Sequence, residues 1–359
     1  MIKKKKKKNK KKTRLKAIDF FCGGGGMTCG LRKAGVRVIA GIDFDKDSEE
    51  TYKTNNPGSF FIHSDINTLK CHDLEKKLKL KKNDNNMIFV GCSPCQYYSI
   101  IRSDKTKSAI SKDLLLQFKR FVEYFRPGYI LVENVPGIIS SKDSVLPEFL
   151  KFLDDMGYKN RENRIINMMQ YGIPQSRKRF SLIATRINKS ISHPKKEKKV
   201  ITVRDVLGEE HGFAKIEAGN IDMTEFFHTA ANLSELNLKR VKKTPKNGGT
   251  RLAWKNDPEL QLKCYVNKDD CFRDVYGRLW WDKPSSTITT NFYKTSNGRF
   301  SHPMENRALS IREGATLQTF PKSYKFKTSS MIKAAKIIGN AVPPEYARRL
   351  GLVIVRHKI

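Results

Sequence analysis

Runs rich in apolar residues alternate with amphipathic stretches through the first half of the chain. The runs at 16–21, 36–42, 61–66, 87–90 and 129–132 have the length and composition of strands, as do 164–168 and 180–184. Apolar positions recur with helical spacing in the intervals 27–34, 70–82, 114–125 and 145–153. Strands that alternate with helices build a parallel sheet covered on both faces. The pattern therefore predicts an α/β fold with a doubly wound, mostly parallel sheet.

This alternation stops near residue 188. From 189 to 291 the chain combines lysines, glycines and scattered aromatic residues without a strand–helix rhythm, which predicts a smaller, irregular domain. We expect a disordered basic arm at 1–14, a first domain at 15–188, the irregular domain at 189–291, and a C-terminal segment at 292–359 whose last helix returns to the first domain.

The chain is strongly basic, with 70 Lys and Arg against 36 Asp and Glu and a formal net charge of +34. Such an excess favours a polyanionic partner, of which nucleic acid is the commonest, although a lysine-rich composition alone would give the same balance. The lysine-rich run at 3–12 could add salt-sensitive affinity for DNA, or act only as a solubilising tail.

Nothing in the sequence indicates a membrane or a secretory protein. No apolar stretch reaches the roughly 18 residues of a membrane-spanning helix, and the basic N-terminus lacks the apolar core of a signal peptide. The seven Cys residues show no regular framework. We therefore expect a cytoplasmic protein with free thiols and no membrane span.

The sequence GCSPCQ at 91–96 follows the strand predicted at 87–90. A Cys in a loop at the carboxyl end of a buried strand, with Pro94 stiffening the backbone before Cys95, is placed as a nucleophile would be. Such a thiol needs a local device that lowers its pKa. Cys92 and Cys95 also have the spacing of a Cys-x-x-Cys redox or metal pair. Taken alone, the motif leaves both interpretations open.

The sequence CGGGG at 22–26 lies between the first predicted strand and helix. Its spacing is not Gly-x-Gly-x-x-Gly and no Lys-Ser/Thr follows, which argues against a phosphate cradle. A cofactor without a pyrophosphate, such as S-adenosylmethionine, could lie against these glycines, and a structural turn is the alternative. Asp43 and Asp65 end the next two strands, where an acidic residue commonly binds ribose hydroxyls but can also be a cap or turn residue.

Three charged residues follow the later predicted strands. Glu133 ends an apolar strand, and apolar surroundings raise the pKa of a carboxyl group, which suits proton transfer to a ring nitrogen. Arg177 and Arg179 are two positions apart, so in an extended loop both guanidinium groups could face one anion. A capping glutamate and a solvated basic loop are the alternatives.

Six motifs in order make the chain resemble the DNA cytosine-C5 methyltransferase family over nearly its whole ordered length. They are the glycine motif at 19–26, GCSPCQ at 91–96, Glu-Asn-Val at 133–135, QSRKR at 175–179, the segment at 307–321 and GNAV at 339–342. The resemblance identifies Cys95 as the nucleophile and leaves Cys92 as a small buried residue.

The resemblance implies S-adenosylmethionine as cofactor, S-adenosylhomocysteine as its product, and no metal. The residues that match the cofactor site are Asp19, Phe21, Gly23, Gly25, Gly26, Asp43, Phe44, Asp65, Ile66, Pro94, Asn340 and Val342. Asp43 stands where many members carry Glu, and Phe44 where a larger aromatic residue can stack on the adenine. Ser93 replaces a frequent second Pro. None of these departures removes a catalytic group.

The family's chemistry assigns a role to each catalytic residue. Attack of the Cys95 thiolate on cytosine C6 makes C5 nucleophilic enough to take the methyl group. Glu133 would hold or protonate N3. Arg179, helped by Arg177, would hold the base carbonyl and a nearby phosphate. Loss of the C5 proton and release of Cys95 complete the reaction.

The resemblance also implies double-stranded DNA as substrate, with the target cytosine flipped out of the helix. The region 189–291 becomes the candidate target-recognition domain. The residues expected to contact DNA are Gln96, Arg251, Arg273 and Arg278, whereas Trp254, Trp280 and Trp281 fit local core better than base stacking.

A monomer is expected, with a restriction endonuclease that acts on the same site as a further partner. The alternatives are a tRNA methyltransferase of the same family, a catalytically silent DNA-binding relative and a nicotinamide oxidoreductase. The glycine spacing and the Pro-Cys-Gln loop count against the last of these.

Overall fold

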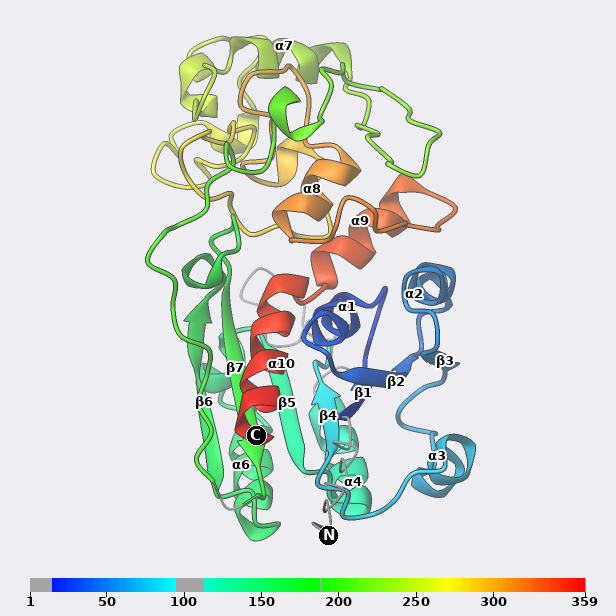
Figure 1. Ribbon diagram of the computed structural model, residues 1–359. Coiled ribbons are helices and arrows are strands. Elements are labelled where there is room, and N and C mark those ends of the chain that lie inside the picture. The colour runs from blue at the N-terminus through cyan, green and yellow to red at the C-terminus, as the bar shows by residue number, and fades with distance from the viewer. Residues whose placement is uncertain (1–14, 95–112, 188, 359) are drawn as a thin grey trace, which may run out of the picture.

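A seven-stranded sheet forms the centre of the larger lobe in the computed structural model, which describes residues 15–94, 113–187 and 189–358 (Figure 1). The strand order is β3-β2-β1-β4-β5-β7-β6. All neighbours from β3 to β5 pair in parallel, while β7 is antiparallel to both β5 and β6. The predicted mostly parallel α/β sheet is therefore confirmed. The strands are β1 (Lys16–Phe20), β2 (Arg37–Asp43), β3 (Phe60–His63), β4 (Met87–Gly91), β5 (Tyr129–Asn134), β6 (Asn160–Asn167) and β7 (Lys178–Thr185).

Helices cover both faces of this sheet. One face carries α1 (Gly26–Lys33) and α10 (Pro344–Lys358), which share a buried apolar cluster with the strands. The other face carries α3 (Cys71–Leu78), α4 (Leu114–Phe125) and α6 (Leu146–Asp155). Two further helices, α2 (Glu49–Asn55) and α5 (Gly137–Ser140), follow β2 and β5.

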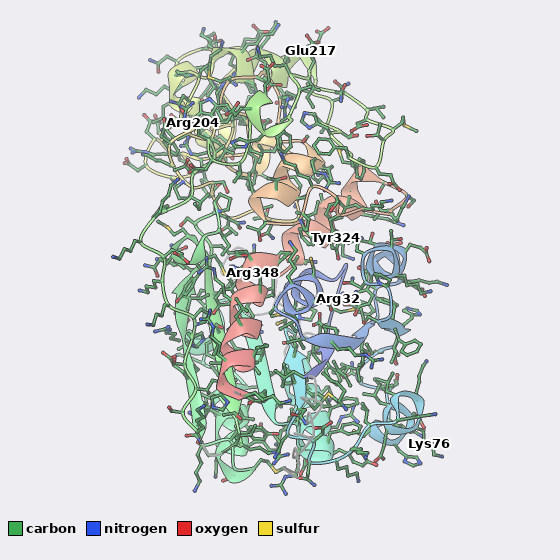
Figure 2. All side chains as sticks on the ribbon, viewed as in Figure 1. Arg32, Lys76, Arg204, Glu217, Tyr324 and Arg348 are labelled. Atoms are coloured by element: carbon green, nitrogen blue, oxygen red, sulfur yellow. The ribbon has the colours of Figure 1, made fainter. Side chains whose placement is uncertain are left out.

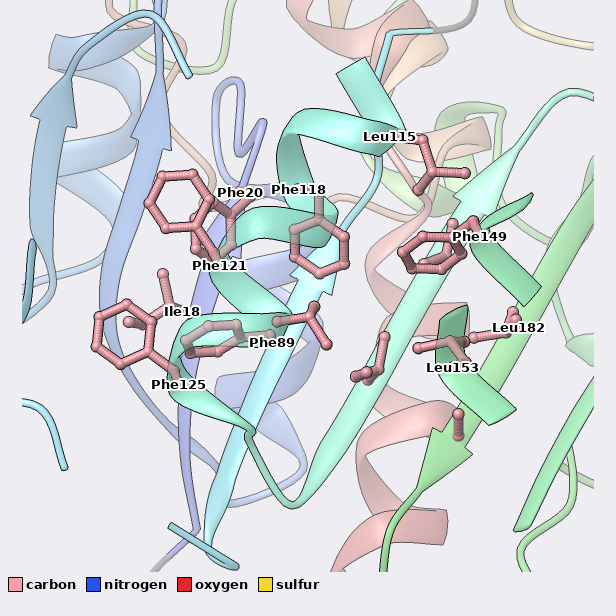
Figure 3. Close-up of a cluster of buried hydrophobic side chains, with 14 of the residues drawn as sticks. Ile18, Phe20, Phe89, Leu115, Phe118, Phe121, Phe125, Phe149, Leu153 and Leu182 are labelled. Atoms are coloured by element: carbon pink, nitrogen blue, oxygen red, sulfur yellow. The ribbon is translucent and has the colours of Figure 1, made fainter. Parts of the chain in front are cut away.

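Aromatic side chains dominate the core between the sheet and α4 (Figure 3). The ring of Phe20 lies 5.0–5.2 Å from the rings of Phe89, Phe118 and Phe121. The buried positions of α4 recur with helical spacing, so one stripe of the helix meets the sheet. The helix ends where Arg126 takes a left-handed conformation (φ 47°) before Pro127, because a residue that precedes proline disfavours helical geometry.

The smaller lobe contains α7 (Glu235–Lys243), α8 (Ile311–Leu317) and α9 (Met331–Asn340), joined by short turns and irregular segments (Figure 1). Its main apolar cluster combines residues from 203–213, 279–300 and 309–338. Segments on both sides of the predicted boundary at residue 291 thus pack into one core, and α10 lies against the sheet. The domain boundaries themselves stay predictions.

The last helix approaches the first one very closely. A Cβ atom on Gly30 of α1 would lie 2.2 Å from the carbonyl oxygen of Pro344 in α10, so only glycine fits there. Across the parts of the chain that the structure describes, no helix combines the length and the apolar character that crossing a bilayer requires.

Candidate active site

The carboxyl ends of the parallel strands meet at the edge of the sheet that faces the smaller lobe (Figure 1). At this edge β1 leads into the glycine turn, β2 ends at Asp43, β4 ends at Gly91 and β5 carries Glu133. The motifs at 19–26, 91–94 and 133–135 are thereby brought together although they are far apart in sequence. Ligands of open α/β sheets bind at such an edge.

Every second residue of the glycine turn has a left-handed backbone conformation, with φ values of 63° at Phe21, 49° at Gly23 and 91° at Gly25. A left-handed phenylalanine costs roughly 1–3 kcal/mol, so its surroundings must hold it. A Cβ on Gly23 would meet nothing within 4 Å, whereas one on Gly25 would meet Tyr324 and one on Gly26 the carbonyl of Val342. Gly23 therefore faces open space, while Gly25 makes room for Asn56 at the end of α2 and for Tyr324 of the smaller lobe, and Gly26 for the segment before α10.

Asp43 ties the end of β2 to this turn. Its Oδ2 accepts a hydrogen bond from the Gly23 amide (2.7 Å) and its Oδ1 accepts one from the Asp45 amide (2.8 Å). Burial raises the pKa of Asp43, and these two hydrogen bonds oppose the rise. Because each carboxylate oxygen can accept more than one hydrogen bond, the group can still bind hydroxyls. The next residue, Phe44, is 67% exposed, and a ring nitrogen of His63 meets its carbonyl at 2.9 Å.

Six of the residues predicted to bind the cofactor line one cavity at this edge. They are Phe21, Asp43, Phe44, Asp65, Ile66 and Pro94, and the same cavity is completed by Phe20, Ile42, Ser64, Asn67 and Leu114. An aromatic face, an acidic group and apolar walls together suit a nucleoside. Asp65 is exposed, and its Oδ1 accepts from both the amide and the side chain of Asn67.

Asp19 lies fully buried at the end of β1. Its Oδ2 accepts from the hydroxyl of Thr28 (2.7 Å), while Oδ1 has no hydrogen-bond partner among the described residues. Burial raises the pKa of Asp19 to about 7. A buried carboxylate oxygen without a donor is costly, so this position fits a ligand that brings an ammonium group.

The two C-terminal residues of the predicted cofactor site are placed differently. Asn340 is exposed at the end of α9. Val342 is buried in the core that α1 and α10 share with the sheet. Neither lines the cavity described above.

Glu133 and Arg179 form a pair across the β5–β7 ladder. Glu133 lies opposite Ser181, so Arg179 is its diagonal neighbour, and Arg179 Nε is 3.2 Å from Glu133 Oε1. Glu133 is 7% exposed. Burial raises its pKa, and the charges of Arg179 and Arg177 partly oppose the rise. A carboxyl of this kind keeps its proton more readily than an exposed one.

The side chain of Arg177 does not point toward Glu133 as that of Arg179 does. Its guanidinium is buried and donates to the carbonyl oxygens of Ile288 (3.0 Å), Gly339 (3.2 Å) and Ala341 (3.4 Å). The prediction that both arginines point at one anion is therefore wrong. β7 begins at Lys178, so Arg177 precedes the strand and the two-residue alternation does not reach it. Arg177 instead joins the large lobe to the smaller lobe and to the segment after α9.

Arg177→Met is expected to lower the free energy of unfolding by about 3 kcal/mol, because the carbonyls of Ile288 and Gly339 lose their side-chain donor and that of Ala341 keeps only Gln318. Arg179→Met is the matched control, since it removes the same charge two positions away and should cost less stability. Urea unfolding of both variants measures the difference. Wild-type stability in Arg177→Met would contradict the structural role.

The nucleophile motif is described only in part. Cys95 and Gln96, predicted as nucleophile and DNA contact, lie outside the residues that the structure describes. Of the residues before them, Cys92 is half-buried against the sheet core and Ser93 is buried, 3.4 Å from the Asn134 amide. Pro94 lines the cavity and is the last residue that the structure describes before Cys95.

Two of the arginines predicted to contact DNA are fully buried. The guanidinium of Arg251 donates to the carbonyl oxygens of Lys268, Cys271 and Phe272. That of Arg278 donates to five oxygens, on Val241, Thr244, His302, Glu305 and Asn306. The prediction of DNA contact is wrong for both, because both side chains are fully buried and donate mainly to main-chain carbonyls of the smaller lobe. Arg273 is exposed and pairs with Asp270, so its DNA contact stays a prediction.

Local core was predicted for Trp254, Trp280 and Trp281, and Trp254 lies in one. This residue is 1% exposed and its ring N–H donates to the Thr244 hydroxyl. Trp280 is half-buried under the cations of Arg299 and Lys283, 3.9 and 4.4 Å from its ring centre.

Sequence reasoning missed the buried glutamines that join the lobes. Gln175 Nε2 donates to Gln318 Oε1 (2.8 Å), and Gln175 Oε1 accepts from the Ile288 amide (2.9 Å). The only signal was the presence of both residues in motifs, which gave no indication that they meet.

Comparison with known proteins decides the family. The model of the C-5 cytosine-specific DNA methylase family matches residues 15–356. The chain belongs to this family. It is 36% identical to a type II methylase of Herpetosiphon aurantiacus, M.HgiDII, over 94% of each chain, and 28% identical to a type II methyltransferase of Bacillus subtilis, M1.BsuMI, over 93% of this chain and 79% of that one.

Solved structures agree on the fold. A prophage-encoded DNA modification methyltransferase from E. coli matches with a TM-score of 0.71 at 20% identity, covering 96% of this chain and 99% of that one. The methyltransferase EhMeth of Entamoeba histolytica matches with a TM-score of 0.65 at 16% identity, again over 96% and 99%. This methylase is thus a C5 methyltransferase with the class I methyltransferase fold, and membership of the family implies use of S-adenosylmethionine.

Proposed function

We propose that this methylase transfers a methyl group from S-adenosylmethionine to C5 of a cytosine in double-stranded DNA. The observation that carries the proposal is the meeting, at one sheet edge, of the cavity described above, the Glu133–Arg179 pair and the residues 91–94 that precede Cys95. The relatives with type II methylase names support DNA as the substrate.

The residues that line the cavity, and those of the adjoining end of β1 and the glycine turn, fit the proposed cofactor. Asp43 would accept from ribose hydroxyls, Phe44 would stack on the adenine, and the unpartnered oxygen of Asp19 would accept from the ammonium of the methionine part. When bound, S-adenosylmethionine supplies the methyl group. The open side of Gly23 lets a ligand lie against the turn.

The catalytic residues act on the cytosine ring. Cys95 attacks C6 as a thiolate, and Glu133 donates a proton or hydrogen bond to N3 as negative charge develops on the ring. Arg179 lies beside Glu133 and would donate to the base carbonyl. The raised pKa of Glu133 suits this donor role, since a protonated carboxyl can donate where a carboxylate cannot.

The smaller lobe is proposed to read the DNA sequence. It is irregular and lies beyond the carboxyl ends of the strands, opposite the proposed active site (Figure 1). We further propose that the methylase protects DNA against a restriction endonuclease of the same specificity and that it acts as a monomer. The type II names of its relatives support the first point.

Transfer of tritium from labelled S-adenosylmethionine tests the substrate. Unmethylated duplex DNA and tRNA are offered separately to the purified protein, and acid-precipitable label is counted. Label on DNA that is confined to a few sequence contexts is the expected result. Label on tRNA alone would overturn the DNA assignment and place the protein with the RNA-modifying alternative.

Asp43→Ala is expected to raise the KM for S-adenosylmethionine by roughly 10- to 100-fold, because it removes a charged acceptor from both the ribose and the Gly23 amide. Asp73→Ala, which removes an exposed carboxylate on α3, is the matched control and should leave KM unchanged. Initial-rate kinetics at saturating DNA measure the effect. An unchanged KM in Asp43→Ala would remove Asp43 from the cofactor site.

A further inference from the structure

The smaller lobe rests on the cofactor side of the large lobe through residues 324–336. Asn55 of α2 donates to the Lys325 carbonyl (2.7 Å) and accepts from the Lys325 amide (2.9 Å). Two ion pairs of 2.7 Å continue the contact, Lys333 with Asp47 and Lys336 with Asp45. The two aspartates, Asp45 and Asp47, come just after Asp43 and Phe44 in the chain, so the contact between the lobes borders the proposed cofactor site.

Tyr324 reaches furthest into the large lobe. It lies at the boundary between the lobes (Figure 2), is 4% exposed, and its hydroxyl donates to the carbonyl oxygen of Gly24 at 2.5 Å. Its ring packs against those of Phe320 and Phe326, 4.8 and 5.6 Å away. The guanidinium of Arg312 binds its carbonyl oxygen at 2.9 Å. The Tyr324 side chain therefore has little freedom to move, and its hydroxyl is held beside the Gly24 carbonyl.

The glycine turn is held from both lobes. Asp43 binds the amide of Gly23 from the large lobe, and Tyr324 binds the carbonyl of Gly24 from the smaller lobe, 300 positions further along the chain. The left-handed φ of Gly25 places its α-carbon beneath the tyrosine, where a Cβ would come within 2.9 Å of the hydroxyl. Two hydrogen bonds on successive residues, one from each lobe, therefore fix the peptide units of the glycine turn, which directly follows the cavity residue Phe21.

We propose that Tyr324 is a positioning residue for the methyl donor, holding the glycine turn in its binding conformation from the smaller lobe without touching the cofactor. This inference rests on the cofactor site proposed above. It makes affinity for S-adenosylmethionine depend on how the smaller lobe is docked, and it gives the lobe a role apart from reading DNA.

Tyr324→Phe removes only the hydroxyl and keeps the ring packing. Tyr158→Phe is the matched control, because Tyr158 is also buried and donates to a main-chain carbonyl, that of Pro127 (2.6 Å), at a distance from the glycine turn. Isothermal titration with S-adenosylmethionine and with S-adenosylhomocysteine measures affinity without DNA, thermal unfolding measures stability, and initial rates separate KM from kcat.

The expected result is a roughly tenfold rise in Kd and in the KM for S-adenosylmethionine in Tyr324→Phe, with kcat at saturating cofactor within about twofold of the wild type. Tyr158→Phe should show wild-type Kd and KM even if its melting temperature falls by as much as that of Tyr324→Phe. Equal affinity in Tyr324→Phe and wild type would overturn the positioning role alone. Failure of the wild type to bind either compound would overturn the proposed cofactor site, and with it this inference.

Discussion

Cys95→Ser is expected to lower kcat for methyl transfer by at least about 10³-fold, since serine at this position is a far weaker nucleophile than a thiolate and loss of a catalytic nucleophile has effects of this size or larger. Affinity for duplex DNA should remain within a few fold of the wild type, because the substitution changes one atom. The measurement combines labelled methyl transfer with a gel-shift titration.

The neighbouring Cys92 supplies the control for that variant. Cys92 is half-buried against the sheet core and does not line the cavity, so Cys92→Ser should retain most of its activity. Activity that survives in Cys95→Ser but is lost in Cys92→Ser would exchange the roles of the two residues. Such a result would contradict the family assignment of the nucleophile.

Glu133→Gln is expected to lower kcat by roughly 10²- to 10⁴-fold, the usual contribution of a positioned acid or base. Glutamine keeps the size of the side chain but transfers no proton. Glu148→Gln, an exposed position on α6, is the matched control and should have wild-type kcat. Rates close to wild type in Glu133→Gln would show that N3 needs no proton from this residue.

The pH dependence of stability gives Glu133 an independent test. Burial raises its pKa in the folded protein above the ordinary value of 4.5, so the folded state holds the proton more tightly than the unfolded chain. Its contribution to stability is therefore fully present below pH 4.5 and is lost as the pH rises through the raised pKa. At pH 8, Glu133→Gln should unfold at a urea concentration no lower than wild type. A clear loss of stability there would contradict the raised pKa.

The fold of the large lobe could be predicted from local patterns in the sequence. Apolar strands and one-sided helices are set by neighbours within a few turns of chain, so the parallel sheet and helices such as α4 could be predicted. The gathering of Asp43, Phe44 and Pro94 at one cavity followed from the rule that parallel strands end at the same edge.

Arginines in the smaller lobe could not be placed from sequence. An irregular backbone leaves carbonyl groups without the ladder or helix donors that regular structure provides, and a guanidinium offers five donors to satisfy them. Arg251 and Arg278 take that role, so their charge and their position in a basic region were misleading. Arg177 shows the same effect at the junction of the lobes.

Contacts between distant segments were also beyond local reasoning. The glycine turn was expected to make room for a ligand, yet Gly25 makes room for Asn56 and Tyr324, and Gly26 for Val342. A motif gives the residue type that a position requires, while the partner that imposes the requirement can lie hundreds of residues away.

Covalent trapping on 5-fluorocytosine tests the central claim most directly. Duplex DNA that carries 5-fluorocytosine in varied contexts is incubated with the methylase and S-adenosylmethionine, and a denaturation-resistant complex is sought on a gel. Fluorine cannot leave as a proton does, so the Cys95 adduct should persist. We predict a complex in a few sequence contexts only, and none with Cys95→Ser. A complex with 5-fluorocytosine-containing tRNA but with no DNA, or a complex that survives in Cys95→Ser, would contradict the proposed function.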